Sequence, residues 1–197
     1  MKSLQGFEKL AKQPSRKRQS ADGRFNLDLP GQIIDEMLKH CARSYPKETG
    51  GILVGHYSDD CKFAHVTDLI PEPSDSVSSR FSFQRGVQGI QRFLNQMWRR
   101  RRYYLGEWHF HPDGSASPSD TDENQMKSIA YAASYHCPEP VLLILGGNPP
   151  QQFTIESYVF LRGASDPVAL EPESTKPDTD LLLNGKKDGG SGGTRIR

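Results

Sequence analysis

Two histidines separated by a single residue, with a serine and two acids a short loop later, are the side chains best suited to chemistry. Residues 106–112 read GEWHFHP, and residues 118–122 read PSDTD. In a β-strand, residues i and i+2 point to the same face, so His109 and His111 can both turn their imidazoles toward one ion. Asp122 can add an oxygen ligand from the start of the next element. Two nitrogens, one carboxylate oxygen and a water make an open tetrahedral zinc site of the catalytic type.

Zinc in such a site lowers the pKa of its water and polarises a carbonyl, but a general base must still accept the proton of the water. Glu48 is the candidate base, because it precedes two glycines that allow backbones to approach closely. Ser119 is the candidate hydrogen-bond donor to the oxyanion or to the water. Asp120 competes with Asp122 as the ligand, although its place at a helix start suits a capping or dipole role.

The spacing of apolar residues predicts the elements that must position these side chains. Helical spacing indicates three helices, at residues 31–45, 84–98 and 119–135. Short apolar or alternating runs indicate strands around the two histidines and at residues 48–55, 63–70, 141–145 and 153–161. This order of elements predicts an α/β fold, in which a single domain holds a mixed β-sheet flanked by helices.

Composition narrows the class of protein. A chain of 197 residues is long enough for one ordinary domain with tails, and its net charge of +1 indicates no particular partner. The three cysteines, Cys41, Cys61 and Cys137, form no paired spacing, which favours reduced thiols in a cytoplasmic protein. We expect no membrane span and no nucleic-acid partner. Residues 1–24 are expected to form a basic flexible arm, and residues 166–197 a disordered polar tail.

The complete set of spaced residues resembles the signature of the JAMM (MPN-plus) metalloproteases. That signature is a distant glutamate, an HxHP motif, a serine and an aspartate, which Glu48, His109, His111, Ser119 and Asp122 match at the expected spacing. The resemblance covers roughly residues 30–162. It implies a metalloprotease domain over residues 25–165 with the JAB/MPN, cytidine-deaminase-like α/β/α fold. It also implies Zn²⁺ bound by the two histidines and the aspartate, with Glu48 as acid and base and Ser119 as transition-state stabiliser.

The family resemblance also implies a substrate class. JAMM enzymes hydrolyse the peptide or isopeptide bond after the C-terminus of ubiquitin or a ubiquitin-like protein. The small size and the GEWH wording are most similar to bacterial members encoded beside E1- and E2-like enzymes in antiphage operons of the CBASS type. There the enzyme removes a conjugated protein from its target. The alternatives are processing of a ubiquitin-like or sulfur-carrier precursor, hydrolysis of a small amide, and a non-catalytic MPN binding module.

Several residues near the motif have simpler interpretations. Glu107 is expected to point to the face opposite the ligands and to form a structural salt bridge. His56 and His65 are expected to be surface or core histidines. The run Arg99–Arg102 is interpreted as a solvated face, with an acidic surface or nucleic acid as the alternative contacts. The stretch 72–82 is expected to form one wall of a substrate cleft.

Overall fold

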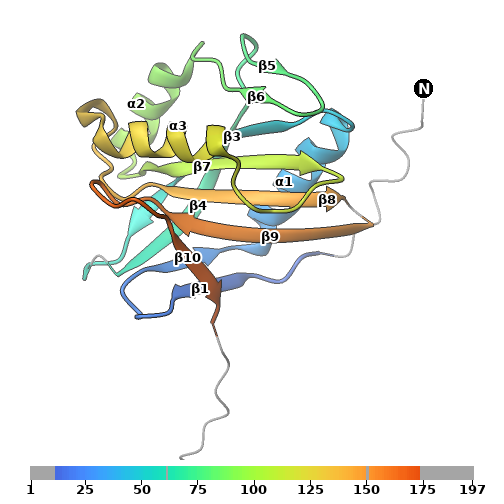
Figure 1. The fold of residues 1–197 in the computed structure, drawn as a ribbon. Helices are drawn as coiled ribbons and strands as arrows, with labels where there is room; N and C mark the ends of the chain where they lie inside the picture. Colours follow the sequence, from blue (N-terminus) through green and yellow to red (C-terminus); the bar gives the residue numbers. More distant parts are fainter. Residues whose placement is uncertain (1–11, 61, 150, 174–197) are drawn as a thin grey trace, which may run out of the picture.

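The computed structural model of the protein describes residues 12–60, 62–149 and 151–173 (Figure 1). Eight strands form one sheet that closes on itself in the order β1-β10-β9-β8-β7-β3-β4-β2. These strands are β1 (Arg16–Ser20), β2 (Asn26–Leu29), β3 (Thr49–Tyr57), β4 (Phe63–Pro71), β7 (Tyr103–Pro112), β8 (Val141–Asn148), β9 (Gln152–Val159) and β10 (Val168–Pro172). The sheet is mixed, because β2 with β4 and β7 with β8 are parallel pairs and the other pairs are antiparallel.

Strand β7, which carries both histidines, lies in the interior of the sheet between β3 and β8. Its antiparallel register with β3 pairs His109 with Gly50, and its parallel register with β8 pairs His109 with Ile144. A strand with neighbours on both sides has its backbone groups satisfied along its length, so its side chains are held in fixed directions. The two histidines therefore sit on a strand whose backbone is held on both sides.

Helices cover both faces of the sheet, as the sequence predicts. Helix α1 (Gly31–Ser44) packs its stripe of Ile34, Met37 and Leu38 against one face, in a core that also contains Trp108 and Phe110. Helices α2 (Ile90–Arg99) and α3 (Asp120–Tyr131) cover the other face, where Met126 and Ile129 pack with Ile52, Leu142 and Ile144. In Figure 1, α2 and α3 lie together on one side of β7. The predicted α/β single domain is confirmed.

The segment before α2 is not helical as predicted. The helix begins at Ile90 rather than near residue 84, because Gly89 takes a left-handed conformation with φ of 79° at its N-cap. Gln84, where the helix was expected to begin, belongs instead to β6 (Phe83–Gln84). This strand pairs with β5 (Val77–Ser78) in a short hairpin. The apolar spacing of this stretch therefore overstated the helix. At the third helix, the α-helical part ends at Tyr131, and a short 3-10 turn, η2 (Ala133–Tyr135), follows it.

The structure also differs from the expectation at both ends of the sheet. Residues Arg16–Ser20, expected in a flexible arm, form β1, and residues Val168–Pro172, expected in a disordered tail, form β10. These two polar strands pair with each other, with Arg18 opposite Pro172, and complete the closure. Within the predicted arm and tail, residues 1–11 and 174–197 lie outside the described residues.

The described cysteines are buried and chemically quiet. Cys41 and Cys137 are buried free thiols, and Cys61 lies outside the described residues. Burial raises the pKa of both thiols, to about 11 for Cys137. Neither is therefore suited to nucleophilic chemistry at neutral pH. Among the described residues, no helix has the length and apolar character needed to cross a membrane.

Candidate metal centre

The alternation of β7 turns both histidines to the face covered by α3, while Trp108 and Phe110 between and beside them enter the opposite core. His109 is 3% exposed, and His111 is partly buried. The His109 ring fits there because its cross-strand neighbour is a glycine. A Cβ atom at Gly50 would lie 3.0 Å from His109 Cδ2 and 2.6 Å from a ring carbon of Phe83. The glycine pair after Glu48 thus permits the close approach that the sequence suggests.

Asp122 reaches the histidines from the first turn of α3. Ser119 is the N-cap, and its Oγ accepts a hydrogen bond from the Asp122 backbone N at 3.2 Å. The backbone N and the Oγ of Ser119 donate to Asp122 Oδ2 at 2.8 and 2.7 Å. This reciprocal capping box uses an aspartate in the third helical position, and it fixes the carboxylate at the end of the helix that favours negative charge.

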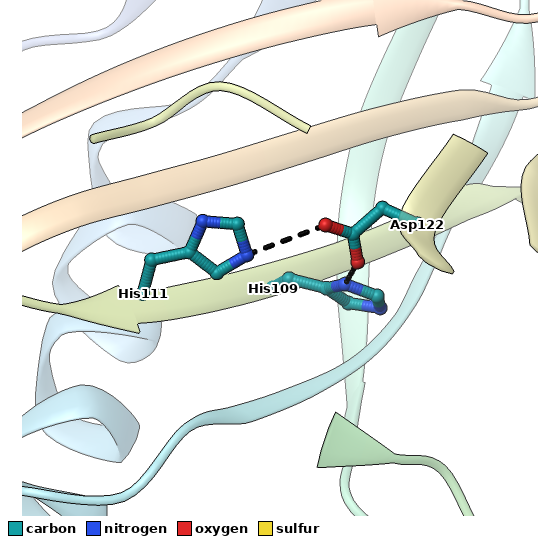
Figure 2. Close-up of side chains that lie close together, drawn as sticks. All are labelled: His109, His111 and Asp122. Carbon is teal, nitrogen blue, oxygen red and sulfur yellow. Dashed lines mark hydrogen bonds and ion pairs between the residues drawn. The ribbon is translucent and has the colours of Figure 1, made fainter. Parts of the chain in front are cut away.

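The three predicted ligands converge (Figure 2). His109 Nδ1 lies 2.6 Å from Asp122 Oδ1, and His111 Nε2 lies 3.4 Å from Asp122 Oδ2. One ligand atom from each of the three side chains lies within 4.8 Å of the others, and no other group of this kind is found among the described residues. His111 Nδ1 lies 3.1 Å from the backbone oxygen of Ser115, which orients Nε2 toward the carboxylate.

Charge pairing dominates this cluster. Burial by itself lowers the pKa of His109, but the carboxylates of Asp122 and Glu107 outweigh it and raise that pKa to about 9. Burial by itself raises the pKa of Asp122, but hydrogen bonds with His109 and His111 hold it well below its usual range. The carboxylate is therefore ionised at neutral pH, and protons on the imidazoles balance its charge when no cation is bound.

Glu48 lies immediately before β3, beside the histidines but outside the group of converging ligands. Its successor Thr49 pairs with Phe110 on β7. Burial raises the pKa of the half-buried Glu48 carboxyl, and His111, Asp122 and His109 are close enough to influence it. The Glu48 backbone is held on both sides, by its N–H donating to Ser79 O at 2.8 Å and by its oxygen accepting from Ser44 Oγ at 3.1 Å.

The expectation for Glu107 is half wrong. Its carboxylate lies on the same face as His109, because the two residues are two positions apart on one strand, and Glu107 Oε2 is 3.8 Å from His109 Nε2. The expected salt bridge is present, and its partner is Arg85 at 2.8 Å. Sequence reasoning missed Arg85 and also Gln125, whose Nε2 donates to Glu107 Oε2 at 2.8 Å. The period of two along β7 is the signal that should have placed Glu107 on the face of His109.

The residues present fit a metal ion. Two imidazoles and a carboxylate are the donors that zinc and similar transition metals take in catalytic sites. The buried His109 Nε2 is one of three buried side-chain polar atoms without a hydrogen-bond partner among the described residues. The edge of the His109 ring that faces the ligand cluster is Nδ1, 2.6 Å from Asp122 Oδ1, and a cation would balance the charge of the ionised aspartate in place of the imidazole protons.

Comparisons with known proteins identify the family of this chain. Residues 30–160 match the family described as prokaryotic homologs of the JAB domain. The chain is 41% identical over 139 residues to a protein of Enterobacter hormaechei named CD-NTase/cGAS isopeptidase, covering 71% of this chain and 77% of that protein. It is 32% identical over 125 residues to a protein of Sinorhizobium fredii named as a probable metalloprotease, covering 61% of this chain and 76% of that protein.

A solved structure supports the fold alone. The solution structure of protein DSY2949 from Desulfitobacterium hafniense superposes with a TM-score of 0.52 and 22% sequence identity. The superposition covers 72% of this chain and 86% of that one. The family match over residues 30–160 and the relative that is 41% identical settle the family relationship. The chain belongs to the family of prokaryotic JAB-domain homologues and is a hydrolase of the metalloprotease type.

Proposed function

We propose that the protein is a zinc-dependent isopeptidase that cleaves the bond after the C-terminus of a ubiquitin-like or other conjugated protein. His109, His111 and Asp122 would hold the ion. The observation that carries this proposal is the convergence of their ligand atoms within 4.8 Å, at a site built by an interior strand and a capped helix. A bound zinc ion supplies Lewis-acid chemistry, acidifying water and polarising an amide carbonyl.

Glu48 would move the proton. A carboxylate beside the ligand set that is not itself a ligand can accept a proton from the attacking water and deliver it to the leaving amine. Its half-buried position supports this role, because burial raises the pKa of Glu48 toward the range in which a carboxyl can both accept and donate. Its anchored backbone, bonded to Ser79 and Ser44, limits the directions that the side chain can take.

Ser119 would act through Asp122 as well as on the substrate. Its hydroxyl proton points to Asp122 Oδ2 at 2.7 Å, so it holds that carboxylate in place for the ion. The sequence-based proposal that Ser119 stabilises the transition state requires the hydroxyl to redirect this hydrogen bond when substrate arrives. Ser119 is exposed, and its backbone N–H also donates to the same oxygen, so Asp122 keeps one donor if the hydroxyl turns away.

The substrate is proposed from the named relative, and one wall of its binding site is proposed from the segment that contacts Glu48. The Enterobacter protein is named an isopeptidase of a CD-NTase, which supports deconjugation in an antiphage system of the CBASS type, in the cytoplasm with E1- and E2-like enzymes. One wall of the cleft would be the stretch 72–82. Ser79 O bonds the Glu48 N–H, and Arg80 reaches Asp113, just beyond the ligand strand, at 3.1 Å.

The direct test is a cleavage assay on three purified substrates. The first joins the C-terminus of a CD-NTase to a lysine of a carrier protein, the second is a linear fusion at the same C-terminus, and the third is a short amide. We expect zinc-dependent cleavage that is fastest on the isopeptide and is abolished by a chelator. Preference for the linear fusion would indicate precursor processing. Absence of cleavage by a stoichiometrically zinc-loaded protein would contradict the proposed activity.

A further inference from the structure

A second carboxylate lies behind the candidate metal centre, and it is more completely buried than any ligand. Glu107 is 0% exposed. Arg85 Nε and Nη2 donate to its Oε1 at 3.0 and 2.8 Å, and the hydroxyl of Tyr104 donates to the same oxygen at 3.3 Å. Gln125 of α3 donates to the other oxygen, Oε2, at 2.8 Å. Four donor atoms therefore fix this carboxylate, from Arg85 just after β6, from Tyr104 of β7 and from Gln125 of α3.

The oxygen fixed by Gln125 is the one that faces the metal centre. Glu107 Oε2 lies 3.8 Å from His109 Nε2, the buried nitrogen that has no hydrogen-bond partner. The opposite edge of the same ring places Nδ1 2.6 Å from Asp122 Oδ1. The imidazole of His109 therefore sits between two carboxylates, one in the ligand cluster and one outside it.

The faces of the His109 ring are confined as well as its edges. Phe83 of β6 meets the ring edge-on, with centroids 5.5 Å apart, and Gly50 leaves room for the ring on the β3 side. Arg85, two residues after Phe83, holds Glu107. One short segment thus contacts the ring directly through Phe83 and indirectly through Arg85 and Glu107.

We propose that Glu107 is a positioning residue for His109, selecting the ring orientation and tautomer in which Nε2 carries the proton and Nδ1 is free to bind a metal. A neutral imidazole has one N–H, and a fixed negative charge beside Nε2 favours that nitrogen as the donor. Metal-binding histidines commonly donate their second nitrogen to a carboxylate, which fixes the ring and strengthens the ligand. The inference rests on the proposed function, because it takes His109 as a ligand.

A purely structural salt bridge makes a different prediction. If Glu107 served only to neutralise Arg85, its removal would lower stability and leave metal affinity unchanged. A control for the loss of an arginine partner exists in Glu156 of β9, whose side chain is 44% exposed and which β8 separates from the ligand strand. Glu156 pairs with Arg18 at 3.2 Å, and Arg18 is 5% exposed, so Glu156→Gln also removes the carboxylate partner of a buried arginine.

The experiment compares Glu107→Gln, Gln125→Met and Glu156→Gln with the wild-type chain. Zinc affinity is measured by competition with a chromophoric chelator, and stability by urea unfolding of the chelator-treated protein. The His109 tautomer is read from long-range ¹⁵N NMR correlations of the metal-free protein at a pH above 9. The Gln125→Met variant leaves the Arg85–Glu107 pair intact, so it folds even if Glu107→Gln does not.

We expect Glu107→Gln to weaken zinc binding by about 10- to 100-fold and to redistribute the His109 tautomers. Gln125→Met should weaken it by a smaller factor, and Glu156→Gln should leave it unchanged. Wild-type zinc affinity in both Glu107→Gln and Gln125→Met would overturn the inference while leaving the proposed function intact. If Glu107→Gln fails to fold, wild-type affinity in Gln125→Met alone overturns it. A wild-type chain that binds no zinc would overturn both.

Discussion

Two pairs of histidines occupy the same sheet, and their surroundings differ. His56 and His65 are cross-strand partners on β3 and β4, stacked with ring centroids 5.0 Å apart. The nearest charged groups approach them from opposite ends, with Arg102 Nη1 3.2 Å from His56 Nδ1 and Asp28 Oδ2 3.1 Å from His65 Nδ1. His109 and His111 instead share one carboxylate, that of Asp122, which lies between them.

The difference explains why His109 and His111, and not His56 and His65, form the proposed metal site. Proximity of two imidazoles is common to both pairs, but only one pair has an anion to which both rings turn. The shift in pKa has opposite signs for His56 and His109. Burial, Arg102 and His65 lower the pKa of His56, whereas the carboxylates beside His109 raise its pKa to about 9 against the effect of burial. A site that binds protons this strongly is also one that attracts a divalent cation.

Replacing a proposed metal ligand should have the largest effect on zinc binding and activity. We expect His109→Ala or His111→Ala to lose stoichiometric zinc and to reduce isopeptide cleavage by at least about 10³-fold, because the ion loses one of three protein ligands. His65→Ala is the control, and it should retain both zinc and activity. Zinc content by mass spectrometry and initial cleavage rates check this, and zinc loss in His65→Ala would contradict the distinction between the pairs.

Replacing the proposed base should separate binding from chemistry. Glu48→Gln keeps the size of the side chain but cannot accept a proton, so we expect unchanged zinc content and a loss of about 10² to 10⁴-fold in kcat. Single-turnover cleavage by the zinc-loaded variant measures the effect. Full activity of this variant would remove Glu48 from the mechanism.

Acidity should act oppositely on His109 and His56. In the metal-free protein the His109 pKa of about 9 lies above its ordinary value of 6.5. Its stabilising contribution is therefore full below pH 6.5 and is lost as the pH rises through 9. Zinc must displace this proton, so zinc affinity should rise about tenfold per pH unit for each proton released.

The lowered pKa of His56 has the opposite sign, and its contribution is lost as the pH falls through 6.5. NMR titration of the imidazole rings in chelator-treated protein distinguishes the two histidines. A midpoint for His109 below that of His56 would show that the carboxylates do not control the ligand pair.

The cap of α3 should have the smallest effect. Ser119→Ala removes the N-cap acceptor and one of the two donors to Asp122 Oδ2. We expect a loss of about 1 kcal/mol in the free energy of unfolding. Zinc affinity should fall by about tenfold, because the carboxylate is less firmly oriented. Ser119→Thr, which keeps the hydroxyl, is the control. An unchanged zinc affinity in Ser119→Ala would mean that the backbone N–H alone suffices to hold Asp122.

Much of the site could be predicted because its geometry is local. The period of two along a strand places His109 and His111 together, and a serine followed three residues later by an acid predicts a capped helix start. Both signals are contained within a few residues. The same period also placed Glu107 beside His109, and the contrary expectation for Glu107 was an error in applying it.

The rest required the fold. Arg85 and Glu107 are 22 residues apart, and Arg85 follows directly after the hairpin of β5 and β6, which the sequence did not predict. Strands β1 and β10 carry few apolar residues. They form strands because the backbone of each pairs with the exposed edge of the other. Because the pairing partner of each strand is distant in sequence, the polar composition of each segment alone predicted a flexible arm or tail.

The most direct test of the account is diffraction at the zinc absorption edge from crystals grown with one equivalent of zinc. We expect one strong anomalous peak, about 2.0–2.2 Å from a nitrogen of His109, a nitrogen of His111 and an oxygen of Asp122. A peak at His56 and His65, or none at the β7 histidines in a protein that cleaves its substrate, would contradict it.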